Sequence, residues 1–115
     1  MRTIIAGSRD ATDIRELLSA IKKCDWEITQ VVCGMARGAD TLGLRWANRM
    51  QIPVAKFPAN WDLYGKSAGY RRNAQMAENA DALIALWDGK SRGTGHMVDI
   101  ARASGLKLLI HQIQL

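Results

Sequence analysis

Apolar residues along this chain form short continuous runs that alternate with longer segments of helical spacing. Each run is short enough for a buried strand, whereas apolar positions that recur every three to four residues are typical of amphipathic helices. The runs predict five strands, at 3–6, 28–33, 53–57, 82–87 and 106–110. The spaced segments predict four helices, the third of them over 70–79. The inward face of the first carries Ile14, Leu17, Leu18 and Ile21, and that of the second carries Ala39, Leu42, Gly43, Trp46, Ala47 and Met50. The inward face of the fourth carries Met97, Ile100 and Ala101.

The alternation of strands and helices predicts a parallel five-stranded sheet covered by helices on both faces. Right-handed crossovers make this a Rossmann-like, doubly wound α/β fold. A length of 115 residues fits one domain over residues 1–115. We expect a polar-aromatic loop at 59–69 and a glycine-rich turn at 89–95.

Composition excludes several classes of protein. Hydrophobic residues make up 48% of the chain and charged residues 23%, a balance typical of globular domains. No apolar run approaches the roughly 20 residues needed to span a bilayer, and Met1-Arg2-Thr3 leads directly into the first strand. Cys24 and Cys33 lack metal-binding or disulfide spacing. We therefore expect a cytoplasmic protein without a membrane partner or a metal site.

The net charge of +5 implies an anionic partner only if the basic residues converge. Ligands of doubly wound sheets bind at the carboxyl ends of the strands, near the point where strand order reverses. The loops expected there are Gly7-Ser8-Arg9, Gly34–Gly38, Pro58–Trp61 and Asp88–Gly95. Three of them combine glycine, which lets backbone N–H groups approach a ligand, with arginine, which binds phosphate through a planar fork. We expect Arg9, Arg37 and Arg92 to grip a phosphate; alternatively, the glycines only end strands and the arginines only cover the surface.

Neither common phosphate-binding fingerprint occurs in the chain. G-x-G-x-x-G is missing after the first strand, and G-x-x-x-x-G-K-[ST] is missing throughout. An ordinary NAD-dependent dehydrogenase or P-loop NTPase is therefore disfavoured.

Together, several motifs resemble the YspA/YpsA-like branch of the SLOG superfamily. They are Gly7-Ser8-Arg9, Val31–Asp40, Phe57–Trp61, Tyr64-Gly65-Lys66, Ala68-Gly69, Arg72-Asn73-x-x-Met76, Ala80–Ala85, Trp87-Asp88-Gly89 and Ser91–Met97. The resemblance covers nearly the whole chain. It implies a Rossmannoid sheet that holds a nucleotide or a nucleotide-derived molecule, and relatives such as LOG-type phosphoribohydrolases imply self-association.

The resemblance to LOG-type hydrolases is incomplete at the catalytic positions. Arg72 and Gly93-Thr94 match the LOG pattern, but its glutamate corresponds to Met97, which cannot transfer a proton. His96 precedes that position and, one residue earlier on a helix, points about 100° away. Asp88 and Asp40 are further carboxylates near the site, and we expect Asp40 to cap its helix. Arg72, Asp88 and His96 are the catalytic candidates, although loss of hydrolysis is favoured.

Individual residues have competing interpretations. Ser8 is not in a G-x-S-x-G elbow, so it is expected to bind phosphate rather than to attack. Trp61 and Tyr64 lie in the polar loop, where they can stack on a base or form a subunit contact. His96 is either a ligand contact or a partly exposed polar residue, and Trp87 either walls the site or packs beneath it. Arg71 and Arg72 oppose the dipole of a helix that begins near them, which favours an anion nearby.

These observations favour a binder of a nucleotide-derived signalling molecule, ADP-ribose-like or a cyclic nucleotide, that acts as a sensor or sequestering protein, in a setting such as phage or bacterial defence. A nucleotide-processing hydrolase is the alternative, and nucleic-acid binding is third because the basic residues are dispersed. No cofactor is assigned beyond this ligand, and a homo-oligomer is expected. The expected ligand contacts are Gly7, Ser8, Arg9, Gly34, Met35, Arg37, Gly38, Trp61, Tyr64, Lys66, Arg72, Asn73, Trp87, Asp88, Ser91, Arg92, Gly93, Thr94 and His96.

Overall fold

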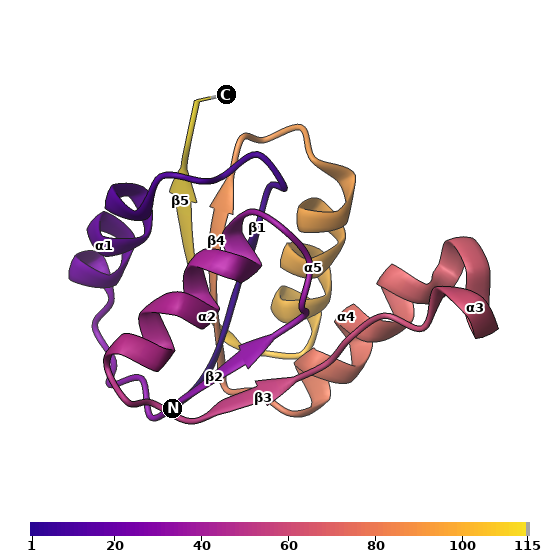
Figure 1. The fold of residues 1–115 in the computed structure, drawn as a ribbon, viewed down its shortest axis with the longest axis horizontal. Coiled ribbons are helices and arrows are strands. Elements are labelled where there is room, and N and C mark those ends of the chain that lie inside the picture. The colour runs from indigo at the N-terminus through magenta and orange to yellow at the C-terminus, as the bar shows by residue number, and fades with distance from the viewer. Residues whose placement is uncertain (115) are drawn as a thin grey trace.

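A computed structural model describes residues 1–114 of the chain as alternating strands and helices (Figure 1). In chain order they are β1 (Arg2–Gly7), α1 (Ile14–Lys23), β2 (Gln30–Cys33), α2 (Ala39–Arg49), β3 (Val54–Lys56), α3 (Trp61–Tyr64), the 3₁₀ turn η1 (Gly65–Ser67), α4 (Ala68–Glu78), β4 (Ala82–Trp87), α5 (Arg92–Ala103) and β5 (Lys107–Gln112). No helix within residues 1–114 is long and apolar enough to cross a membrane.

The five strands form one parallel sheet in the order β3-β2-β1-β4-β5, which confirms the predicted Rossmann-like α/β fold. From β1 the chain moves outward through β2 to β3, and it then crosses to β4 on the other side of β1. Strand order therefore reverses between β1 and β4. This is the position where doubly wound sheets bind ligands, and Gly7 pairs there with Leu86.

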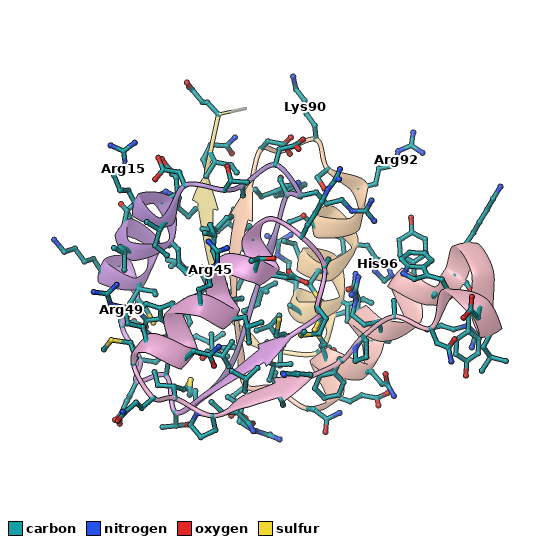
Figure 2. The ribbon with its side chains drawn as sticks, in the orientation of Figure 1. Arg15, Arg45, Arg49, Lys90, Arg92 and His96 are labelled. Atoms are coloured by element: carbon teal, nitrogen blue, oxygen red, sulfur yellow. The ribbon has the colours of Figure 1, made fainter. Side chains whose placement is uncertain are left out.

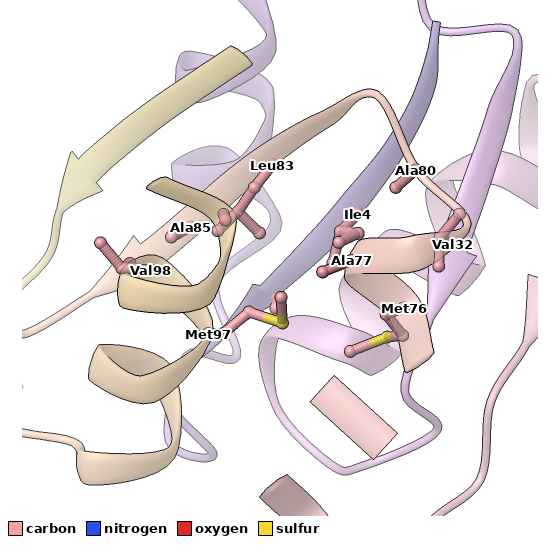
Figure 3. Packing of buried hydrophobic residues seen from close by; sticks show 11 residues of the cluster. Ile4, Val32, Met76, Ala77, Ala80, Leu83, Ala85, Met97 and Val98 are labelled. Atoms are coloured by element: carbon pink, nitrogen blue, oxygen red, sulfur yellow. The ribbon is translucent and has the colours of Figure 1, made fainter. Parts of the chain in front are cut away.

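Two apolar clusters cover opposite faces of the sheet, because successive side chains on a strand point to opposite faces. Ile5 packs with Leu17 and Leu42 of α1 and α2. Ile4 packs on the other face with Met76 of α4 and Met97 of α5, as Figure 3 shows. Both isoleucines are fully buried.

Helix α1 is attached to the edge of the sheet through a buried histidine. His111 of β5 is 7% exposed, and its Nε2 lies 2.7 Å from Glu16 Oε2, while its Nδ1 lies 3.2 Å from Lys23 Nζ. Since α1 covers β4 and the edge strand β5, only part of its apolar face reaches the sheet. This explains why Ile14 and Leu18, predicted to face inward, are exposed; Met50 at the end of α2 is exposed as well.

Two segments predicted as loops are partly helical. The segment 59–69 contains α3 and η1, because Asn60 Oδ1 accepts a hydrogen bond of 3.1 Å from the Leu63 N–H and caps a short turn. The turn predicted at 89–95 ends early, because α5 already begins at Arg92. The third predicted helix also begins earlier, at Ala68 after η1, so Arg71 and Arg72 lie beyond its first turn. The argument from the helix dipole for an anion beside them is therefore lost.

Gly7 is required by the close approach of β1 to β4. A Cβ atom at this position would overlap the Leu86 carbonyl oxygen and approach the Ala39 side chain, whereas a Cβ at Gly93 in α5 would meet open space. We expect Gly7→Ala to lower the free energy of unfolding by about 2–4 kcal/mol. Gly93→Ala is the control and should leave it unchanged or raise it by up to about 1 kcal/mol. Urea denaturation measures both, and equal stability of the two variants would contradict the close packing.

Candidate functional site

A cavity of about 600 Å³ lies at the carboxyl end of the sheet, beside the β1/β4 switch point. Its lining comes from the end of β1, the start of α2, the α3–α4 segment and the loop that leads into α5. The lining residues are Ala6, Gly7, Ser8, Arg9, Asp10, Ala36, Arg37, Asp40, Trp61, Lys66, Gly69, Tyr70, Arg72, Asn73, Met76, Asp88, Lys90, Ser91, Gly93, Thr94 and Met97. The cavity thus gathers residues that are far apart in the sequence.

Ser8 presents an unused hydroxyl group at this cavity. Its backbone is fixed, since its N–H donates to Leu86 and its carbonyl accepts from the N–H groups of Ala11 and Ala39. The side chain is buried, yet Oγ has no hydrogen-bond partner within residues 1–114. Leaving such a buried group unpaired costs about 1–3 kcal/mol. The Ser8 hydroxyl is therefore suited to a hydrogen bond with a ligand.

Two helix N-termini border the cavity without a side-chain cap. α2 is preceded by Gly38, which has no side chain to act as a cap. α5 is preceded by Ser91, whose side chain makes no capping hydrogen bond to the N–H groups of the first turn of the helix. The first N–H groups of a helix lack partners within it, and the helix dipole makes them attractive to negative charge. The lining beside them includes Arg37 and Asp40 on one side and Ser91 and Thr94 on the other.

Five basic side chains line the cavity: Arg9, Arg37, Lys66, Arg72 and Lys90. Of the three arginines predicted to converge, Arg9 and Arg37 do so. Arg92 lies at the same edge of the sheet but outside the lining, and Figure 2 shows its side chain extending away from the body of the protein. The third arginine at the cavity is Arg72, which comes from α4 instead of the α5 loop.

A network of hydrogen bonds fixes the guanidinium of Arg72. It donates through Nη1 to the Gly34 carbonyl and through Nε to Asn73 Oδ1, the latter at 3.1 Å. Asn73 is itself buried and in turn contacts the Gly93 carbonyl at 3.3 Å. The network connects the end of β2 with α4 and α5, so the position of Arg72 is fixed from three elements.

Asp40 lines the cavity as a buried carboxyl group and does not cap its helix as predicted. The N-cap is Gly38, and Asp40 Oδ2 instead accepts a hydrogen bond of 3.1 Å from the Ala36 N–H. Burial raises the pKa of Asp40 from its ordinary value of 3.8 to about 6, against the opposing effects of the Ala36 N–H and the Arg72 charge. At neutral pH the cavity therefore holds a carboxylate that is poorly solvated.

Asp88 is an acceptor in its own loop. Its Oδ1 receives hydrogen bonds of 2.9 Å from the N–H groups of both Lys90 and Ser91. The Ser91 and Lys90 N–H groups lower the pKa of Asp88; the nearby Ser8 hydroxyl contributes less, and its Oγ lies outside hydrogen-bond geometry. Asp88 is consequently ionised at neutral pH and is a poor general acid.

His96 of α5 lies outside the lining of the cavity, next to α4 (Figure 2). Its Nδ1 is 3.1 Å from Asn73 Nδ2, and its ring centroid is 4.3 Å from that of Tyr70. Burial lowers the pKa of His96, so the ring is neutral at pH 7 and Nδ1 can accept from the Asn73 amide. His96 thus supports Tyr70 and Asn73, which do line the cavity.

The aromatic residues divide between the cavity and other contacts. Trp61 and Tyr70 line the cavity and are 51% and 48% exposed. Tyr64 lies outside the lining with the Arg71 guanidinium 4.4 Å from its ring centroid. Trp87 packs beneath the 88–91 loop, where its Nε1 donates to the Ser91 carbonyl at 3.1 Å. The structure therefore brings together Trp61 and Tyr70 as the accessible aromatic pair.

Most of the predicted contacts share this cavity. Those outside its lining are Gly34, Met35, Gly38, Tyr64, Trp87, Arg92 and His96. Residues that line it without having been predicted as contacts are Ala6, Asp10, Ala36, Asp40, Gly69, Tyr70, Met76, Lys90 and Met97. The signal for Tyr70 is its position next to the polar-aromatic loop. The sequence gave no sign that Met76 reaches a cavity, whereas the match of Met97 to the glutamate position of LOG-type hydrolases indicated a place near the site.

Comparison with known proteins decides the family. Residues 1–64, more than half of the chain, match the model of the YspA, cpYpsA-related SLOG family. The chain belongs to this family. The matched part of the SLOG domain runs from β1 to α3 and includes Ser8, Arg37 and Asp40. The chain is also similar to the Gene 61 protein of Mycobacterium phage D29, with 33% identity over 118 residues that cover 94% of each chain. Membership of the SLOG family fits a nucleotide-related role.

The buried carboxyl group of this SLOG domain predicts a stability effect. The folded state disfavours the ionised form of Asp40, so burial of this group lowers the free energy of unfolding. This destabilisation is fully present above pH 6 and is lost as the pH falls through 6 towards 3.8. Asp40→Asn should therefore raise the free energy of unfolding at pH 7.5 by up to about 3 kcal/mol. The gain should shrink to about 0.5 kcal/mol at pH 4.

Urea denaturation at pH 7.5, 6 and 4 measures this effect. Asp62→Asn is the matched control, because Asp62 is exposed on α3 and the same charge is removed there. A loss of stability in Asp40→Asn at pH 7.5 would show that the carboxylate is not penalised by burial.

Proposed function

We propose that this protein binds a nucleotide or nucleotide-derived signalling molecule, of the ADP-ribose-like or cyclic-nucleotide type, and acts as a sensor or sequestering protein. The observation that carries the proposal is the unpartnered, buried hydroxyl of Ser8 in the cavity at the β1/β4 switch point. A ligand oxygen at this position would complete a hydrogen bond that the folded chain leaves unmade.

The phosphate groups are assigned to the part of the cavity around Ser8. The uncapped N-terminus of α5 supplies backbone N–H groups, and Arg9 and Arg37 supply positive charge. This combination of helix dipole, N–H donors and guanidinium groups suits a phosphate group.

The base is assigned to the part of the cavity where Trp61 and Tyr70 are exposed. Stacking of a base on an aromatic side chain contributes roughly 1–3 kcal/mol in single-stranded nucleic acid complexes. A volume of about 600 Å³ lies within the usual range for small-molecule sites. A mononucleotide or a molecule of similar size would fit.

Binding without turnover is favoured by the chemistry of the lining. Met97, at the position of the glutamate in LOG-type hydrolases, contributes an apolar thioether, and Asp88 is held in its ionised form. A relative of similar length occurs in a phage, one of the settings expected from the sequence.

Removal of the phosphate contacts should weaken binding of a nucleotide. We expect isothermal titration calorimetry with ADP, ADP-ribose and 3′,5′-cyclic AMP to identify at least one ligand. For that ligand, Ser8→Ala should raise the Kd about 3- to 10-fold and Arg37→Ala about 5- to 30-fold. Arg49→Ala, which removes an exposed charge at the far end of α2 (Figure 2), should leave the Kd unchanged. The absence of binding below millimolar concentration across the panel would contradict the proposal.

Hydrolysis of an N-glycosidic or phosphoester bond is a second candidate, favoured by one observation. Asp40 has a pKa of about 6 inside the cavity, a value suited to proton transfer near neutral pH. If the protein is an enzyme, chromatography should detect product from ADP-ribose or a nucleotide, and Asp40→Asn should abolish product formation. Recovery of intact ligand after prolonged incubation would leave binding as the function.

A further inference from the structure

We propose that Asp40 and Arg72 form a subsite for a sugar hydroxyl group, so that the ligand must carry a ribose with free hydroxyls. This inference rests on the proposed function and specifies the part of the ligand that lies between the phosphates and the base. It is carried by the geometry of two side chains that approach the same space from different helices.

Asp40 offers one fixed acceptor to the cavity. It is 6% exposed in the first turn of α2, and the Ala36 N–H holds its Oδ2. The Ala36 residue is itself fixed, because its carbonyl accepts from Thr41 Oγ1 at 3.2 Å. Oδ1 of Asp40 accepts no hydrogen bond from the part of the chain that the structure describes. A ligand atom that meets this oxygen must be a hydrogen-bond donor.

Arg72 of α4 reaches the same region as Asp40. A Cβ atom built on Gly34 would lie 2.8 Å from both Arg72 Nη1 and Asp40 Oδ2, so both side chains flank the open side of this glycine. Nevertheless, no ion pair joins Asp40 and Arg72 within residues 1–114. Arg72 uses Nη1 and Nε for the Gly34 carbonyl and Asn73, which leaves Nη2 for the cavity.

A group that lies between these side chains must donate to the carboxylate and accept from the guanidinium. A hydroxyl group does both, whereas an ionised phosphate oxygen only accepts and is repelled by the carboxylate. The carboxylate therefore disfavours phosphate beside Asp40, in a cavity that five basic side chains and the carboxylates of Asp10 and Asp88 also line. Phosphate is directed to Ser8 and Arg37, and the adjoining sugar to Asp40 and Arg72.

The test compares three nucleotides that differ only in their sugar hydroxyls. Calorimetry at pH 8 with ADP, 2′-deoxy-ADP and 2′,3′-dideoxy-ADP should give a Kd about 10- to 100-fold lower for ADP than for the dideoxy compound. In Asp40→Asn this preference should fall below about threefold, chiefly through weaker binding of ADP. Arg49→Ala should retain the full preference, and thermal unfolding of each variant verifies that it is folded.

The outcomes separate this inference from the proposed function. Equal binding of the three nucleotides to the unmodified protein would overturn the hydroxyl subsite and leave nucleotide binding in place. A full preference for ADP in a folded Asp40→Asn variant would also overturn it, because selection would then arise elsewhere. If none of the three binds at millimolar concentration, the hydroxyl subsite fails; if ADP-ribose and 3′,5′-cyclic AMP do not bind either, the proposed function fails with it.

Discussion

The backbone of Ser8 is the constraint on which the cavity depends. Its N–H bonds to the Leu86 carbonyl of β4, and its carbonyl accepts from Ala11 before α1 and from Ala39 at the start of α2. Ser8, directly after β1, thereby connects β1 with β4 across the strand-order reversal and with the N-terminus of α2. Gly7 makes the approach possible because it has no Cβ atom. The Ser8 hydroxyl is left over from this arrangement, buried and unpaired.

The fold was predictable from the sequence because it depends on periodicity. β4 has the predicted bounds, and the other strands differ by one or two residues at their ends. The clearest errors lie at helix starts: Asn60 caps α3 in a segment predicted as a loop, and α5 begins, without a side-chain cap, at Arg92 within the predicted turn. Capping hydrogen bonds depend on side-chain geometry that hydrophobic spacing does not report.

The site was partly predictable, since strand ends determine which loops meet but not where each side chain points. Arg9, Arg37 and Ser8 share the cavity as expected, while Arg92 leads outward and Tyr64 lies beside Arg71. The preference of aspartate for helix N-caps predicts Asp40 as the cap of α2, but Gly38 occupies that position. The buried carboxylate next to Arg72 emerges only in three dimensions. A charge retained at a cost in stability is a common mark of a functional site.

Met76 and Met97 belong both to the apolar cluster between α4, α5 and the sheet and to the lining of the cavity. Their unbranched thioether chains can adjust to the shape of whatever they touch. A molecule bound in the cavity would contact these two side chains and so affect the packing on this face of the sheet. Because a ligand that binds only the folded state stabilises it, occupancy of the cavity and the thermal stability of the protein would rise together. The packing of the interior would change directly with the bound molecule.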